Sequence, residues 1–245
     1  MSLLDQEQLL LSLEVPPDLS FDRFIVGSDN ERVFNAVKRL CDESHPSESL
    51  LLVGESGTGK THLLHAAVRQ TQLTTKSGIY VHANDLIKEC LSCTDREERL
   101  NLSAQYQNYH LVALDALEIL ATDATAQEVV LYLYNLLLAN GGIFLIASQV
   151  NPMAMVGLRS ELRSRLLWGK VLELHPLGDE ELFGVMQKIA FDRSLQLSDD
   201  LIHFLVMRLP RSVLEYTKAI ELLDQQSSRR SRNIAIPLAK ELFNL

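Results

Sequence analysis

The chain has 245 residues, 47% of them hydrophobic, and a formal net charge of −9. That length is enough for one large domain or two smaller ones with a sizeable core. The acidic balance excludes a typical stand-alone binder of nucleic acid, because attraction to phosphates supplies most non-specific affinity. It leaves room for action beside a partner that is itself on DNA.

The sequence carries no sign of secretion or of a membrane span. Its first basic residue is Arg23, so the N-terminus does not have the form of a signal peptide. Three cysteines, an odd number, favour a reduced compartment. Residues 129–158 have no charge, but Gly141 and Gly142 divide them into a predicted helix and a predicted strand. We therefore expect a cytoplasmic protein with no membrane partner.

Residues 1–17 are predicted to form an N-terminal tail. Between residues 18 and 175, short apolar runs alternate with helical patterns. The runs cover 50–53, 79–82, 111–115, 143–147 and 171–174, and the helical patterns cover 30–41, 61–70, 83–93 and 125–139. Strands that are apolar throughout are buried on both faces, which is typical of parallel sheets. The alternation predicts an α/β domain with a five-stranded parallel sheet between helices.

Beyond Leu174 the pattern changes, and residues 176–245 are predicted to be helical throughout. The expected elements are a helix over 179–191, a second capped by Ser198, a third from about 210 to about 224, a loop over 225–233 and a short helix after Pro237. We interpret this part of the chain as a small all-helical lid.

Residues 54–61 read G-E-S-G-T-G-K-T and fit the phosphate-loop pattern G-x4-G-K-[ST], between an apolar run and a helical pattern. Glycines let the backbone N–H groups surround phosphate oxygens at a helix N-terminus. Lys60 is expected to reach the β- and γ-phosphates, and Thr61 to hold Mg²⁺. The predicted cofactors are ADP or ATP with Mg²⁺. The predicted contact residues are Gly54, Gly57, Thr58, Gly59, Lys60, Thr61 and His62.

Residues 111–115 end in Asp115, which has the Walker-B form of an apolar strand followed by an acid. Asp115 is therefore the predicted magnesium-side carboxylate. The next residue is Ala116, where many enzymes of this type carry a second acid that polarises the attacking water. Glu118 would share a strand face with Ala116 if the strand continued. It either substitutes in part for the missing acid or is a solvated charge.

Two further polar groups are candidates. Ser148 or Gln149, at the end of the run 143–147, would sense the γ-phosphate, or else both face solvent. Downstream, Arg159, Arg163 and Arg165 form either a solvated helix face or the source of an arginine finger, a guanidinium that stabilises charge on a transferring phosphoryl group.

Three segments give the chain a resemblance to a known family. They are F-D-R-F-I-V-G at 21–27, G-T-G-K-T-H-L-L-H-A at 57–66, and L-R-S-R at 162–165, which leads into Trp168 and Gly169. With these segments the chain resembles the DnaA-type AAA+ proteins. The resemblance implies an AAA+ nucleotide domain with a helical lid. It also implies that Ile25, Val26 and Asn30 line the adenine side.

The two ends of the chain are similar to the Hda family, the regulatory relatives of the initiator. Residues 8–13 look like that family's sliding-clamp-binding peptide, with Gln8, Leu9, Leu11 and Leu13 as its contacts, and residues 236–242 look like its C-terminal helix. We expect no helix-turn-helix DNA-binding domain after the lid.

The resemblance implies a task performed on a partner. A nucleotide-bound Hda-type protein on a DNA-loaded sliding clamp presents an arginine to ATP on a DnaA-type initiator, and hydrolysis switches initiation off. By position, Arg165 is the candidate finger in trans. The basic residues at 229–232 are either a solvated loop or a weak DNA contact beside the clamp. The sequence leaves monomer and homo-oligomer open.

Two departures from the initiator's pattern predict weak or absent ATP hydrolysis by the chain's own site. One is Ala116. The other is Leu214, which aligns with the lid arginine that senses nucleotide. Arg211, one turn earlier on the same predicted helix, either substitutes for that arginine or is solvated. The competing interpretations are a DnaA-like or helicase-loader ATPase that acts directly in initiation, and a non-hydrolysing subunit like those of clamp loaders.

Overall fold

The computed structural model describes residues 19–42, 46–211, 213–230 and 234–243. For residue 214 and residues 227–230 only the backbone is described. The chain divides into two compact units. The α/β unit runs up to Val26 and continues over Asn30–Leu174, and the helical unit comprises Gly27–Asp29 and the chain from His175 onward.

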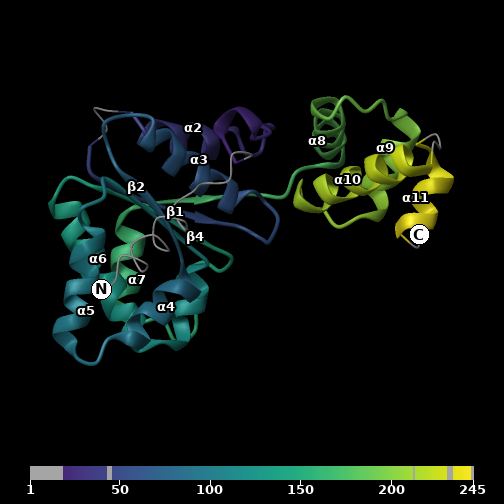
Figure 1. Cartoon of the computed structure of the whole chain (residues 1–245). Coiled ribbons are helices and arrows are strands. Elements are labelled where there is room, and N and C mark those ends of the chain that lie inside the picture. Colours follow the sequence, from purple (N-terminus) through teal and green to yellow (C-terminus); the bar gives the residue numbers. More distant parts are fainter. Residues whose placement is uncertain (1–18, 43–45, 212, 231–233, 244–245) are drawn as a thin grey trace. The chain divides into compact units, whose positions relative to one another are not determined.

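The α/β unit alternates strands and helices along the chain (Figure 1). Its elements are η1 (Phe21–Arg23), α2 (Glu31–Leu40), β1 (Glu48–Val53), α3 (Lys60–Gln72), β2 (Gly78–His82), α4 (Ala83–Ser92), α5 (Arg96–Tyr106), β3 (Leu111–Asp115), η2 (Leu117–Thr122), α6 (Ala124–Ala139), β4 (Ile143–Ser148), α7 (Ser160–Trp168) and β5 (Lys170–Glu173). The five predicted strands are all present, and the uncharged segment divides into α6 and β4 as expected.

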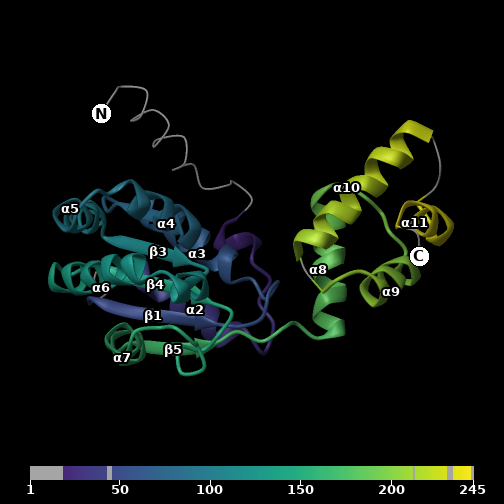
Figure 2. The ribbon, with the colours of Figure 1, turned by 90° about the horizontal axis from the view of Figure 1, so that it is seen from below.

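The strands form one parallel sheet in the order β2-β3-β4-β1-β5. Figure 2 shows β3, β4, β1 and β5 side by side in this order. Val53 pairs with Ser148 across β1 and β4, and His82 pairs with Asp115 across β2 and β3. The carboxyl ends of the strands therefore meet at one edge, where open α/β sheets bind ligands. The predicted five-stranded parallel sheet is confirmed.

Both faces of the sheet are covered because successive side chains of a strand point to opposite sides. In β1, Leu50 and Leu52 belong to the apolar cluster shared with α2 and α3. Leu51 and Val53 belong to the second cluster, shared with α4, α6 and α7. Burial on both faces is why the strands read as continuous apolar runs in the sequence.

Helix α5 is an element that the sequence analysis missed. Its sequence is polar and lacks an obvious apolar stripe. Its start is nonetheless encoded, because Asp95 Oδ1 accepts from Glu98 N at 2.9 Å while Glu98 Oε2 accepts from Thr94 N at 2.6 Å. An acidic pair with this spacing is a capping pattern that would have located the helix.

The helical unit contains α8 (Asp179–Asp192), α9 (Asp199–Arg208), α10 (Val213–Arg230) and α11 (Ile236–Phe243). Ser198 caps α9 as predicted, since its side chain accepts from Leu201 N. The predicted loop over 225–233 is wrong for residues 225–230, because α10 continues to Arg230. That stretch contains neither Gly nor Pro to stop a helix. In the described part of the chain, no helix is both long and apolar enough to cross a membrane.

Candidate nucleotide-binding site

The phosphate loop joins β1 to α3 at the carboxyl edge of the sheet. Gly57 and Gly59 have φ of 83° and 98°, a left-handed conformation that glycine adopts without steric cost. A side chain at Gly59 would also meet the ring of Phe24, whose Cε2 lies 2.8 Å from the Cβ position. Gly59 gives α3 no side-chain cap, so the first N–H groups of that helix face the loop as an anion site.

Lys60 is buried at the base of this loop, with 7% of its surface exposed. Its Nζ donates to the main-chain oxygens of Gly54 at 2.6 Å and Glu55 at 2.7 Å. Burial lowers the pKa of Lys60, while the negative charges of Asp115 and Glu118 oppose that shift. The loop carbonyls thus hold the ammonium group at the phosphate loop.

Asp115 closes the β3 end of the site and is fully paired. Its Oδ2 accepts from Thr61 Oγ1 at 2.6 Å and from Tyr80 OH at 2.9 Å, and its Oδ1 accepts from Ala116 N at 2.8 Å. Tyr80 was not identified from the sequence. Burial and the adjacent carboxylate raise the pKa of Tyr80 well above its usual range. The His65 ring stacks on the Tyr80 ring with centroids 3.9 Å apart, which helps to fix the orientation of Tyr80.

Thr61 and Asp115 are the predicted magnesium residues, and the structure brings them into direct contact. Their hydroxyl and carboxylate oxygens are the donors that Mg²⁺ prefers beside substrate phosphates. No group of three or more His, Cys, Asp or Glu that could hold a metal occurs among the described residues. A magnesium nucleotide needs none, because phosphates and water supply most of the ligands. The donor set therefore fits a magnesium-bound nucleotide.

The β4 end of the site differs from the expectation for Glu118. Strand β3 stops at Asp115, so Glu118 does not share a strand face with Ala116. Glu118 lies instead in η2, half-buried, and its Oε2 accepts from Ser148 Oγ and Gln149 N, both at 3.0 Å. Ser148 is fully buried, so it is not a solvent-facing strand end. The candidate sensor and the additional acid are in direct contact.

The residues expected at the adenine side form a small turn. The buried Asn30 amide donates to Ile25 O at 2.9 Å and fixes this turn, while Val26 is exposed. His62 Nε2 lies 2.8 Å from Ser20 O, and the His62 ring meets Phe24 edge-to-face. These contacts tie the segment before α2 to the first turn of α3, which positions an apolar and aromatic wall beside the phosphate loop.

Helix α7 carries the arginines, and their environments differ. Arg163 is half-buried and donates through Nη2 to Met155 O and Leu158 O, both at 3.1 Å, so it stabilises the loop before α7. Arg159 is exposed at the helix N-terminus. The Arg165 guanidinium lies 4.9 Å from the centre of the Trp168 ring, which is 77% exposed. The arginine run is therefore not a uniformly solvated face.

Gln127, on α6, is a residue that the sequence analysis overlooked. Its buried Nε2 donates to Leu120 O, Ala121 O and Gly157 O at 2.9, 3.1 and 3.2 Å, and its Oε1 accepts from Arg159 N at 2.8 Å. One side chain thus connects η2 to the start of α7. A lone glutamine in an apolar helix has no sequence pattern that announces this role.

Arg211 precedes its helix, because α10 begins at Val213. The expectation that Arg211 lies one turn before position 214 on the same helix is therefore wrong. Arg211 belongs to the connection between α9, which ends at Arg208, and α10. The Arg211 guanidinium pairs with Asp179 at the start of α8, and both side chains are exposed. An exposed pair of this kind contributes at most about 1 kcal/mol and is easily exchanged.

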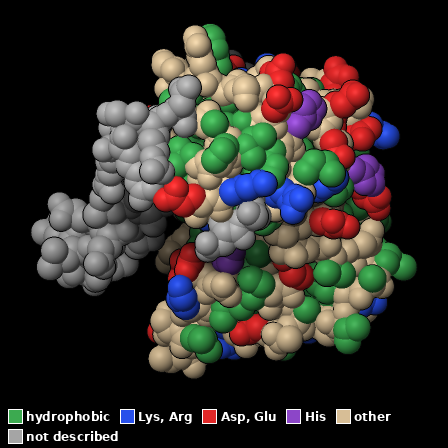
Figure 3. All heavy atoms as spheres, turned by 90° about the vertical axis from the view of Figure 1, so that its right-hand side faces the viewer, with side chains coloured by type: hydrophobic (Ala, Val, Ile, Leu, Met, Phe, Trp, Pro, Cys, Tyr) green, Lys and Arg blue, Asp and Glu red, His purple; other side chains and the backbone are tan. Residues whose placement is uncertain are grey.

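Several predicted positions cannot be placed. The clamp-binding residues Gln8, Leu9, Leu11 and Leu13 lie outside the described residues, as do the basic side chains at 229–232 and the side chain of Leu214. On the face shown in Figure 3, acidic side chains are dispersed and Lys and Arg side chains gather only in small groups.

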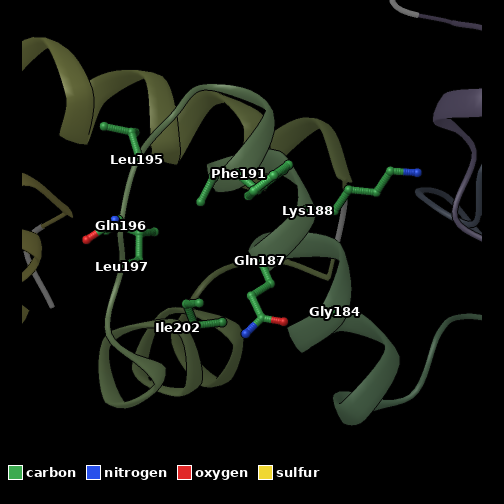
Figure 4. A pocket seen from close by; sticks show the side chains of 9 residues that line it. Gly184, Gln187, Lys188, Phe191, Leu195, Gln196, Leu197 and Ile202 are labelled. Carbon is green, nitrogen blue, oxygen red and sulfur yellow. The ribbon is translucent and has the colours of Figure 1, made fainter.

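The helical unit has a groove of about 460 Å³ between α8 and the start of α9. Figure 4 shows Phe191, Leu197 and Gln187 along it, with Lys188 directed away. No carboxylate, histidine or cysteine lines this groove, and its one ionisable residue is Lys188. Asp115 and Ser148, two of the catalytic candidates, lie instead at the carboxyl edge of the sheet.

Comparison with known proteins gives two family matches that together span most of the chain. The sequence model of the bacterial DnaA ATPase domain matches residues 15–173. The model of the Hda lid domain matches residues 179–243.

An uncharacterized protein of Haemophilus influenzae is 31% identical over 241 residues, which cover 98% of this chain and 99% of that protein. Among solved structures, domain III of the replication initiation protein DnaA from Thermotoga maritima has a TM-score of 0.83, with 20% identity over 94% of this chain and 98% of its own. AMPPCP-bound DnaA from Aquifex aeolicus has a TM-score of 0.78, with 24% identity over 86% of this chain and 67% of its own. At these identities the structural likeness shows the fold, which is that of a DnaA-type AAA+ domain.

Proposed function

The chain belongs to the family of the bacterial DnaA ATPase domain and carries an Hda lid domain, and we propose that it is a nucleotide-bound regulator that stimulates hydrolysis of ATP on a DnaA-type initiator. The family matches support a DnaA-related AAA+ protein that regulates replication. The partner, the sliding clamp and the arginine finger are our proposal.

The observation that carries the proposal is the position of the Arg165 guanidinium over the Trp168 ring. Arg163, two residues earlier, uses its guanidinium to brace the loop before α7. Arg165 makes no ion pair with a described residue and is held over the exposed Trp168 ring. Stacking on an aromatic face orders a guanidinium while leaving its in-plane N–H donors free. Such an arginine is prepared to meet a phosphoryl group on another molecule.

The chain's own nucleotide has a supporting role in this proposal. Lys60, Thr61 and Asp115 would hold ADP or ATP with Mg²⁺, and the turn from Ile25 to Asn30 would face the adenine. A bound nucleotide stabilises whichever state of the protein binds it. We propose that this nucleotide-bound form engages the clamp through the peptide at residues 8–13 and presents Arg165 to the initiator.

A reconstitution tests the proposal. Initiator loaded with labelled ATP is incubated with this protein and DNA-loaded clamp, and the formation of ADP on the initiator is followed. We expect stimulation that needs both the protein and the clamp. Arg165→Ala should reduce the stimulated rate by about 10³-fold, because a finger in trans contributes about 10³–10⁵. Nucleotide binding by the variant itself should stay unchanged.

Arg159→Ala is the matched control, since Arg159 is an exposed arginine at the start of the same helix. It should stimulate like the unaltered protein. No stimulation by the unaltered protein would rule out the regulator. Full activity of the Arg165 variant would remove Arg165 from the role while leaving the regulator in place.

A further inference from the structure

Position 116 cannot deliver a second acid to this site in the present fold. Ala116 has φ of 59° and ψ of 45°, a left-handed conformation that costs an L-residue about 1–2 kcal/mol. Its half-buried side chain packs against the apolar cluster on the side of α4, α6 and α7. Strained backbone of this kind is concentrated at functional sites, where it directs the chain.

The left-handed turn at Ala116 redirects the chain from β3 into η2, and η2 brings Glu118 to the end of the neighbouring strand β4. There the Glu118 Oε2 atom accepts from the Ser148 hydroxyl and from the Gln149 N–H. Among the described residues no group donates to the other oxygen, Oε1. One carboxylate oxygen is thus anchored and the other is available.

Glu118 also lies beside the phosphate loop, since its hydrogen-bond partner Ser148 accepts through its main-chain oxygen from Gly54 N at 3.1 Å. Glu118 opposes, through its negative charge, the lowering of the Lys60 pKa that burial causes. It is half-buried, so solvent screens it less than a surface carboxylate. An anchored carboxylate with one available oxygen, beside the phosphate-binding lysine, has the form of a group that orients water.

We propose that Glu118 is the second acid of this nucleotide site and gives the chain ATP hydrolysis of its own. In this step the water oxygen forms a bond to the γ-phosphorus, and the bond from that phosphorus to the bridging oxygen breaks. ADP leaves with the electron pair of the broken bond. The proton of the water passes to Glu118 Oε1 and then to solvent, so the products are ADP and phosphate. This activity goes beyond the proposed action on a partner and does not depend on it.

The test uses the full chain alone, without initiator or clamp, so its outcome is independent of the proposed regulation. Excess protein is mixed with labelled ATP and Mg²⁺, and formation of ADP is followed in a single turnover. Glu118→Gln keeps an oxygen that can accept from Ser148 and Gln149 but removes the base. We expect it to lower the single-turnover rate by about 10²–10⁴-fold, the usual contribution of a general base.

Binding gives a second readout that separates chemistry from structure. The dissociation constants for ATP and ADP of Glu118→Gln, measured by calorimetry, should stay within about threefold of those of the unaltered protein. Glu161→Gln, at an exposed glutamate of α7, is the matched control and should change neither quantity. Glu118→Ala, which also removes the anchor to β4, should lose hydrolysis and have a lower midpoint of thermal unfolding.

Three results would overturn the inference. One is hydrolysis by Glu118→Gln at the unaltered rate, because the carboxylate would then play no part in the reaction. Another is the absence of any ADP from the unaltered protein in a single turnover. The third is loss of nucleotide binding in Glu118→Gln, which would make the role of Glu118 a structural one.

Discussion

The α/β unit and the helical unit bury different kinds of side chain. The buried polar and charged residues of the described chain all belong to the α/β unit, and they are Asn30, Ser49, Thr58, Lys60, Thr71, Ser103, Asp115, Gln127 and Ser148. In the helical unit the buried side chains are apolar, apart from the hydroxyl of Tyr216. Buried polar groups are costly unless they are hydrogen-bonded. The α/β unit therefore folds around buried polar groups that need partners, and Lys60, Asp115 and Ser148 among them lie at the carboxyl edge of the sheet, whereas the helical unit folds by apolar burial.

Lys60→Met is expected to have the largest effect on the polar edge of the α/β unit. The change removes the cation that the loop carbonyls hold in place. Charge-assisted hydrogen bonds contribute about 1.5–3 kcal/mol each, so we expect nucleotide affinity to fall by about 100-fold or more. A titration with a fluorescent adenine nucleotide measures it.

Lys218→Met is the control for that change. Lys218 is exposed on α10 and pairs only with Glu215, one turn away. The same substitution should leave nucleotide affinity unaltered. If both lysine variants bound nucleotide alike, the polar edge of the sheet would not be the site.

Gln127→Leu tests the polar edge where no ligand is involved. Leucine leaves the Arg159 N–H and three carbonyls without their partner inside the α/β unit. We expect the free energy of unfolding to fall by about 2–3 kcal/mol, measured by urea denaturation. Stimulation of the initiator should fall as well, because Gln127 fixes the start of the helix that carries Arg165.

Gln105→Leu makes the same change at an exposed position of α5 and should alter stability by less than about 0.5 kcal/mol. Equal stability of the two leucine variants would show that the Gln127 contacts carry no net stabilisation.

The sequence predicted those features that a pattern of a few neighbouring residues determines. The phosphate loop, Asp115 and the five strands follow from apolar runs and a glycine spacing, which act over a few residues. Glu118 was misjudged because its position depends on the left-handed turn at Ala116, which no propensity predicts for alanine. Tyr80 and Gln127 were missed for a related reason. Each joins segments 30 or more residues apart in the chain, and single-sequence patterns carry no information on such contacts.

Removal of one tyrosine hydroxyl in each unit, buried in the helical unit and half-buried in the α/β unit, gives the smallest effect. In the helical unit the Tyr216 hydroxyl is buried and has no hydrogen-bond partner among the described residues, and burial raises its pKa. Tyr216→Phe removes a polar atom that gains nothing there, so the free energy of unfolding should stay the same or rise by up to about 1 kcal/mol. Urea denaturation of the full chain, followed by circular dichroism, measures the change.

Tyr80→Phe makes the same deletion in the α/β unit, where the hydroxyl donates to Asp115 Oδ2 at 2.9 Å. Here we expect a loss of about 1.5 kcal/mol, because a hydrogen bond to a charged acceptor disappears and Asp115 keeps only two donors. The two variants should thus differ in sign although each loses one oxygen atom. If both substitutions changed the free energy of unfolding in the same direction, the Tyr80 hydroxyl would add no more stability through its bond to Asp115 than the unpartnered Tyr216 hydroxyl does.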